Sequence, residues 1–413
     1  MSPLASYRRL LHLAGPTYVL VAFLGRLPLA MSQLGTLLLV SSATDRYGLG
    51  GLAAGALAVA NALGAPVAGG LADRVGQRPV VLVQSLAGAL GLLALVLQVG
   101  GSTPLTIVIA ALAGLAMPQV GPLARVRWRP LTHGTGHEQR RLVDAAFAYE
   151  GAADEASFAL GPALVGLVAV AISPSGALLV AAGLLAVFGS AFALDASARH
   201  TRHHGAAVAG RLLTGILLTL ALAQLCIGVL FGATQTGATV LATAAGDPGA
   251  AGFVHATLGV GSAVAGLLTA YLPERIGHER RAFAAAVGLL VLSLPLLLVD
   301  SLLTVTLAVL LLGCAVAPYM IAVFSMGERV VPQSRVGAAM TVLASATGIG
   351  YALGASVAGR LADATGTHTA AFGVTVTTTV LAVVLMVVSQ RRLRAALTSH
   401  GDQDHVAAVG AGA

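Results

Sequence analysis

Long stretches without a charged residue recur along the whole chain and limit the folds that are open to it. Residues 80–98 and 286–299 are two of these stretches, and many others approach the roughly 20 apolar residues that cross a bilayer. Only 9% of the residues are charged, whereas a soluble globular chain carries about 25%. The sequence therefore predicts an all-α polytopic membrane protein.

Hydropathy and the positions of glycine and proline predict twelve membrane-spanning helices. Six are predicted in each half of the chain, at residues 15–40, 49–70, 80–99, 104–124, 144–172, 176–194, 212–243, 251–272, 282–299, 302–324, 336–358 and 369–388.

The arginines indicate the orientation of these helices. If the N-terminus lies inside, twenty of the 23 basic residues fall on cytoplasmic segments, only Arg46 and Arg360 fall outside, and Arg26 lies within the first span. Positive residues concentrate on the cytoplasmic side of membrane proteins. We therefore expect both termini in the cytoplasm of a multi-pass protein of the plasma membrane. This distribution also explains the net charge of +7 without a nucleic-acid partner.

A polar interruption at the middle of the chain divides it into two similar parts. The sequence predicts an N-terminal six-helix bundle at 1–196, a cytoplasmic linker at 197–211 and a C-terminal six-helix bundle at 212–390. Residues 391–413 are polar and then small, which predicts a disordered cytoplasmic tail.

Several classes of enzyme are excluded by residues that the chain lacks. All 23 basic residues are arginine, so no Walker A loop and no Schiff-base lysine can form. The sequence also contains no His-Glu-x-x-His metal motif and no serine nucleophile elbow. We therefore expect neither an enzyme, nor a metal site, nor a bound cofactor.

Four similar segments indicate an internal repeat. GAPVAGGL, GPALVGLV, GSAVAGLL and GASVAGRL begin at residues 64, 161, 261 and 354, on the second, fifth, eighth and eleventh predicted helices. Each has glycines five positions apart, and small residues let membrane helices approach closely. The spacing predicts a three-helix unit that is used four times.

A second motif follows the first of these segments. GGLADRVGQRP occupies residues 69–79, and related sequences follow at 272–280 and 359–366. It resembles the signature loop between helices two and three of the major facilitator superfamily, Gly-x-Leu-Ala-Asp-Arg-x-Gly-Arg-Arg. Gln77 replaces a usual basic residue. The matching residues include Gly69, Asp73, Arg74, Gly76 and Arg78.

The resemblance extends over nearly the whole chain, because helix number, central linker and repeat spacing also fit. It implies a secondary transporter in which two six-helix bundles rock around a central cavity. It also implies that Asp73 and the nearby arginines form a cytoplasmic latch for the outward-facing state. A basic turn that only sets the topology is the alternative. In the superfamily, helices one, four, seven and ten line the cavity, which makes Gln33, Gln119, Gln235 and Tyr319 candidate lining residues.

Acidic residues inside the fifth predicted helix are unusual, because a charge at the centre of a membrane helix costs about 2.5–3.5 kcal/mol. Glu150, Asp154 and Glu155 lie there, and Arg26 in the first helix lies at a similar predicted depth. We expect Arg26 to pair with Asp154 or Glu155, which leaves at least one acid without a cation. The acids either couple transport to protons or bind substrate, or they only clamp the two helices together.

The fifth helix also carries Gly161, Pro162 and Gly166, which partly resemble the antiporter motif of the superfamily. A Gly-Pro pair would also serve to bend a long helix. Because the other spans hold few polar residues, we expect small, amphipathic or hydrophobic substrates.

The prediction for function is a monomeric, proton-coupled transporter that exports such compounds by antiport and uses the H⁺ gradient as its energy source. A proton symporter for metabolite uptake is the alternative within this class. A non-transporting receptor or scaffold with the same fold is the alternative from another class. Membrane lipid and the small-molecule substrate are the expected partners.

Overall fold

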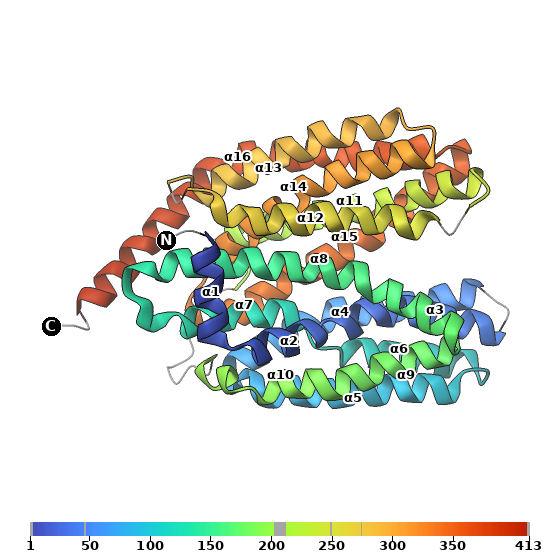
Figure 1. Cartoon of the computed structure of the whole chain (residues 1–413), viewed down its shortest axis with the longest axis horizontal. Coiled ribbons are helices and arrows are strands. Elements are labelled where there is room, and N and C mark those ends of the chain that lie inside the picture. Colours follow the sequence, from blue (N-terminus) through green and yellow to red (C-terminus); the bar gives the residue numbers. More distant parts are fainter. Residues whose placement is uncertain (1–2, 45–46, 202–211, 248–249, 274, 411–413) are drawn as a thin grey trace.

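The computed structural model describes residues 3–44, 47–201, 212–247, 250–273 and 275–410. It confirms the twelve predicted crossings, because the described residues contain twelve helical segments that are long and apolar enough to span a membrane. No strand is present in these ranges. The membrane-spanning helices run along one common direction, and both termini lie at the same end of the molecule, called here the terminal end (Figure 1).

The first half of the chain contains six spans and a short helix, α1, that precedes them. Its elements are α1 (Pro3–Ala14), α2 (Pro16–Leu24), α3 (Leu27–Thr44), α4 (Tyr47–Val75), α5 (Gln77–Gln98), α6 (Thr103–Leu115), α7 (Val120–Leu131), η1 (His133–Glu138), α8 (Gln139–Ala171), α9 (Pro174–Leu184), η2 (Leu185–Gly189), α10 (Ser190–Leu194) and η3 (Ala196–Thr201).

The second half contains the other six spans. Its elements are α11 (Gly215–Ala244), α12 (Ala250–Leu268), η4 (Thr269–Tyr271), α13 (His278–Ser293), η5 (Leu294–Leu297), α14 (Leu302–Arg329), η6 (Gln333–Arg335), α15 (Val336–Thr365) and α16 (His368–Gly410).

The predicted linker and the predicted C-terminal tail need separate comment. Most of the predicted linker, residues 202–211, lies outside the described residues. The sequence predicted disorder for 391–413, but α16 continues as helix to Gly410. Its first 30 residues form the twelfth span, and the remainder extends past the terminal end (Figure 1).

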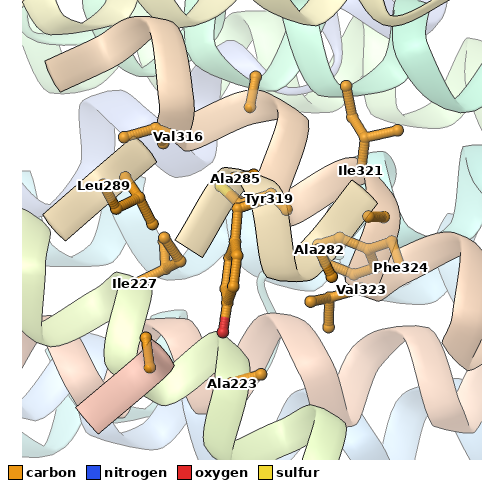
Figure 2. Close-up of a cluster of buried hydrophobic side chains, with 14 of the residues drawn as sticks. Ala223, Ile227, Ala282, Ala285, Leu289, Val316, Tyr319, Ile321, Val323 and Phe324 are labelled. Carbon is orange, nitrogen blue, oxygen red and sulfur yellow. The ribbon is translucent and has the colours of Figure 1, made fainter. Parts of the chain in front are cut away.

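The two halves lie side by side and meet along a seam that runs through the centre of the molecule. Figure 1 shows α11–α14 and α16 along one side and α2–α7, α9 and α10 along the other, with α8 and α15 between them. At the seam, α8 packs on α12 and α4 packs on α15. Apolar side chains fill the second half and the neighbouring part of the seam, where Tyr319, Phe324 and Ile321 of α14 lie (Figure 2).

Two of the six spans in the first half are interrupted near their middle. The first span breaks at Gly25 and Arg26, between α2 and α3, and the fourth breaks at residues 116–119, between α6 and α7. Asn61 of α4 satisfies backbone groups at the second break, because its Nδ2 donates to the carbonyl oxygens of Gly114 and Met117 at 3.2 and 3.0 Å. Irregular backbone at membrane depth is tolerated where it is buried in protein in this way.

Candidate functional site

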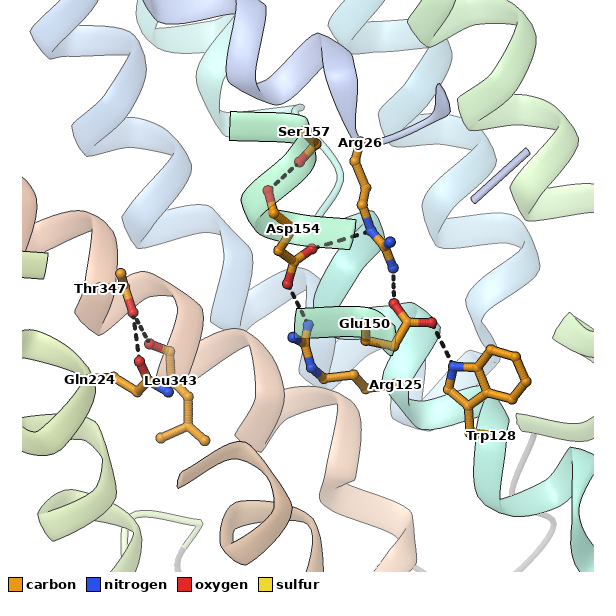
Figure 3. A network of polar contacts seen from close by, with 9 residues as sticks. All are labelled: Arg26, Arg125, Trp128, Glu150, Asp154, Ser157, Gln224, Leu343 and Thr347. Atoms are coloured by element: carbon orange, nitrogen blue, oxygen red, sulfur yellow. Dashed lines mark hydrogen bonds and ion pairs between the residues drawn. The ribbon is translucent and has the colours of Figure 1, made fainter. Parts of the chain in front are cut away.

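A network of buried charges lies at the level of these two breaks. Arg26 occupies the break in the first span, and its side chain contacts Glu150 of α8. Its Nε also lies 3.3 Å from Oδ1 of Asp154, one helical turn further along α8 (Figure 3). Helix α8 therefore brings two acids to one cation on the first span, as the spacing of four residues on a helix requires.

The fourth span supplies two further members of the network, which the sequence did not identify. Arg125 of α7 places Nη1 2.7 Å from Oδ2 of Asp154, and Trp128 Nε1 donates to Oε1 of Glu150 at 2.5 Å (Figure 3). The sequence had assigned Arg125 to a cytoplasmic segment, but the structure buries it within the bundle. The spacing of three residues, which puts Arg125 and Trp128 on one face of a helix, was the signal for this pair.

Glu155 lies apart from the ion pairs of this network. Arg26 was expected to pair with Asp154 or Glu155, and it pairs with Asp154 and, in addition, with Glu150. Glu155 is buried and lies close to Ser262 of α12, so it faces the other half of the molecule. Among the described residues of the network, the two guanidinium groups thus pair with Glu150 and Asp154, and the third carboxylate, Glu155, is outside these ion pairs.

Arg125 also brings the network into contact with the second half. Its guanidinium carbon lies 4.4 Å from the ring centroid of Phe324 on α14, a cation–π arrangement. Glu155 and Arg125 therefore both lie where the two halves of the molecule meet.

Asp73, in the last turn of α4 and part of the segment that resembles the superfamily signature, binds the other half at the terminal end. Its two carboxylate oxygens accept from the backbone N–H groups of Gly337 and Ala338, at 2.9 and 2.8 Å, in the first turn of α15. A carboxylate is stabilised at a helix N-terminus, where unpaired N–H groups carry partial positive charge. Asp73 therefore binds the end of a helix in the other half, while the side chains of Arg74 and Arg78 are exposed.

Gln77, which departs from the superfamily pattern, has a partner that explains the exchange. Its Oε1 accepts from Nε of Arg127 at 2.8 Å, and its Nε2 donates to the Leu123 carbonyl oxygen at 3.1 Å. Arg127 is fully buried here. A basic residue at 77 would place a second positive charge beside it. The preceding Gly76 has φ of 92°, a backbone conformation that favours glycine.

Two further ion pairs join the halves at the terminal end. Arg129 Nη1 lies 3.1 Å from Oε1 of Glu328, and Arg329 Nη2 lies 2.6 Å from Oδ1 of Asp144. Nε2 of His278 lies 3.3 Å from the same oxygen of Asp144. Asp144, the first residue of the fifth predicted span, therefore contributes to the contact between the halves.

The Gly-Pro segment of α8 lies against the first span. A Cβ atom on Gly161 would lie 2.6 Å from Cβ of Ala30 in α3, so only glycine fits without a shift. Pro162 lies inside α8, which continues as helix past it. A Cβ on Gly166 would meet no atom within 4 Å.

The four candidate lining residues have different surroundings. Gln33 is exposed. Gln119 is buried and donates to Oδ1 of Asn61 at 2.7 Å, and Gln235 accepts from the hydroxyl of Tyr351. Tyr319 is fully buried among apolar side chains, and its hydroxyl points toward the helix that carries Ala223 (Figure 2). In this state Gln119, Gln235 and Tyr319 pack against their neighbours within their own halves.

Comparison with known proteins identifies similar sequences and folds. The family model for the Major Facilitator Superfamily matches residues 216–408. No curated protein matches the chain. Solved structures match nearly all of it.

Three of these structures are transporters. The human organic anion transporter MFSD10 (TETRAN) is 22% identical, with a TM-score of 0.69 over 89% of this chain and 98% of that one. A bacterial homologue of the iron transporter ferroportin, in the outward-facing state, is 15% identical, with a TM-score of 0.67 over 90% and 97%. FucP, the fucose:proton symporter of E. coli, is 15% identical in its outward conformation, with a TM-score of 0.63 over 91% and 98%. At these identities the structures establish the fold.

Proposed function

We propose that this chain, a member of the major facilitator superfamily by its fold and by the sequence of its second half, is a proton-coupled secondary transporter. It moves small, amphipathic or hydrophobic compounds across the cytoplasmic membrane by alternating access, and it exports them in exchange for protons. The H⁺ gradient supplies the energy. The terminal end then faces the cytoplasm, as the arginine distribution suggests.

Glu155 is the observation that carries this proposal. Arg26 and Arg125 neutralise Glu150 and Asp154, so Glu155 is the surplus acid of the network. Removal from water disfavours the charged form of a carboxylic acid, so a buried acid without a cation takes up a proton. The structural alternative, a clamp between the first and fifth spans, accounts for the other two acids but not for Glu155.

Glu155 lies where the movement of the two halves changes its surroundings, which links its protonation to the conformational change. The acid lies between α8 and α12, on opposite halves of the molecule, near Ser262. When the halves rock, the surroundings of Glu155 change more than those of a residue inside one half. A group whose proton affinity differs between two conformations couples the conformational change to the proton gradient.

The contacts at the terminal end supply the second part of the proposal. We assign the latch to Asp73 on the first turn of α15, supported by the Arg129–Glu328 and Arg329–Asp144 pairs. All three contacts join the two halves, so all must break before the terminal end opens. Their combined effect stabilises the conformation in which that end is closed.

The apolar character of the seam supports amphipathic or hydrophobic substrates. The Gly161–Pro162 segment, which partly resembles the antiporter motif, supports export. A proton symporter remains the alternative, and the similarity of the fold to FucP, a fucose:proton symporter, is a specific reason to test it. A receptor or scaffold with the same fold is the alternative outside transport.

The test starts by finding a transported compound. Expression in an efflux-deficient bacterial host, with a panel of toxic amphipathic compounds, should protect against some of them, and a protonophore should abolish the protection. The purified protein is then reconstituted into vesicles with that compound and an imposed pH gradient. Proton movement opposite to the compound supports antiport, and movement in the same direction supports symport. No flux at any pH supports the scaffold.

Glu155→Gln should abolish the pH-driven flux and leave expression and thermal stability unchanged, because the amide removes a proton site without leaving a buried charge. Asp300→Asn is the matched control, since Asp300 is exposed between α13 and α14 and should transport normally. Full proton-coupled flux in Glu155→Gln would remove Glu155 from the mechanism.

A further inference from the structure

A cavity of about 310 Å³ lies at the terminal end, where the first and second halves meet. Both halves contribute to its walls. Arg141, Asp144 and Ala145 come from the start of α8, and the segment from Thr269 to Pro273 and Arg281 come from the second half. The transport mechanism above does not use this cavity.

The charges around the cavity favour an anion. Arg141 and Arg281 both line it, and each lies in the first turn of its helix. The one described acid in the wall, Asp144, already pairs with Arg329 at 2.6 Å and with His278 at 3.3 Å. Arg281 is held at the wall by its own backbone contacts, since Nε donates to the Ile276 carbonyl oxygen at 2.9 Å and Nη2 to that of Pro273 at 3.1 Å. The cavity therefore has one arginine from each half in its wall, Arg141 and Arg281, and backbone contacts hold the second of them in place.

The rim of the cavity is apolar and exposed. Leu268, Tyr271 and Leu272 expose 56%, 53% and 39% of their surface beside the basic wall. A ligand that fits both surfaces has an anionic group and a hydrocarbon part. Inorganic phosphate or a soluble phosphate ester satisfies only the first surface.

Helix α1 indicates that this part of the molecule lies at the surface of the membrane. It runs across the direction of the other helices (Figure 1), and the Tyr7 hydroxyl donates to the Leu267 carbonyl oxygen at 2.8 Å, next to the cavity rim. Burial raises the pKa of Tyr7, so the phenol keeps the proton that it donates. Leu4 and Leu11 are exposed and share a helical face with Arg8, which is typical of helices that lie in the headgroup region.

We propose that this cavity binds the phosphate group of an anionic membrane lipid between Arg141 and Arg281, with the acyl chain of the lipid along Leu268 and Leu272. A bound phosphate connects the two halves at the terminal end, as the latch does, and so favours the conformation in which that end is closed. A soluble phosphate ester offers the same charged group, and the experiment distinguishes the two sources. The proposal needs a membrane location but does not depend on proton coupling.

The experiment measures lipid binding to the purified full-length protein by native mass spectrometry, with three probes. These are phosphatidylglycerol, phosphatidylcholine and glycerol 3-phosphate. We expect selective retention of phosphatidylglycerol over phosphatidylcholine, and no competition by an equal concentration of glycerol 3-phosphate. Arg141→Gln should weaken phosphatidylglycerol binding about fivefold and Arg141→Glu about 25-fold, because each unit of charge at a membrane surface contributes about that factor.

Arg392→Gln, an exposed arginine of α16 that does not line the cavity, is the matched control and should bind like the wild type. Arg141 is only partly buried, so neither substitution removes a fully buried group, and equal unfolding temperatures check this directly. Equal binding of both lipids, or unchanged binding in Arg141→Glu, would overturn the site. Equal competition by glycerol 3-phosphate would overturn the assignment to a lipid.

Discussion

Arg26 shows what counting residues along a membrane helix can predict and where it fails. Its depth relative to Asp154 follows from the rise of 1.5 Å per residue, so the sequence placed these groups together correctly. The same count placed Arg125 outside the membrane, because charged residues near the end of a hydropathy peak are normally assigned to a loop. The break at residues 116–119 and the burial of α7 are tertiary features that hydropathy does not contain.

The pair formed by Arg26 and Glu150 leads to a stability prediction. Arg26→Met leaves a fully buried Glu150 with only the Trp128 donor, and breaking a buried ion pair costs about 3–5 kcal/mol. Adding Glu150→Gln removes the uncompensated charge and retains an acceptor for Trp128. Thermal unfolding in detergent should therefore rank wild type first, the double variant second and Arg26→Met last. Equal unfolding temperatures of Arg26→Met and the double variant would show that Glu150 is neutral in Arg26→Met, so that the single variant contains no uncompensated charge.

At the scale of elements, the repeated glycine pairs have two different roles. The first glycine of each pair packs a helix onto a neighbour within its own half: Gly64 of α4 on α6, Gly161 of α8 on α3, Gly261 of α12 on α14, and Gly354 of α15 on α11. In each half, the middle helix of one three-helix unit thus packs on the first helix of the other unit. This reciprocal contact is expected for inverted repeats. The sequence predicted the repeat from spacing alone, but it could not say which helix each glycine would meet.

Two glycines of α8 offer a matched comparison of this packing. Gly161→Val should lower the unfolding temperature, since the added atoms overlap Ala30 of α3 and overpacking costs about 1–3 kcal/mol. Gly166→Val, five residues further along the same helix, should melt within error of the wild type because no atom lies within 4 Å of its Cβ position. A similar loss in both variants would mean that valine disturbs α8 itself rather than its contact with α3.

At the scale of the whole molecule, the second glycines report which end is closed. Gly69 and Gly266 lie toward the terminal end. An added Cβ on Gly69 would overlap Thr341 of α15, on the opposite half. One on Gly266 would lie 3.0 Å from Ala317 of its own half and 3.6 Å from the backbone nitrogen of Ala152 in α8, on the opposite half. Gly166 and Gly359 lie toward the opposite end and have open space. Asp73, at the end of α4, also shows that the terminal end is the closed one, because its carboxylate binds α15 on the opposite half. The sequence established that these four positions correspond, but one sequence encodes both conformations, so it could not predict which one the structure would adopt.

The open glycines lead to a prediction that tests alternating access itself. If the repeats exchange roles when the molecule changes state, Gly166 and Gly359 must become the close contacts that Gly69 and Gly266 make here. Gly166→Leu and Gly359→Leu should therefore fold normally but reduce flux at least about tenfold, because the opposite end cannot close. Gly183→Leu, also an open glycine but on α9 and away from the seam, should transport normally.

A cysteine at Gln33, in a background without Cys226 and Cys314, should stay reactive toward an impermeant thiol reagent in both blocked variants. Normal flux with leucine at both 166 and 359 would show that the two halves do not approach each other at these glycines in any state of the cycle.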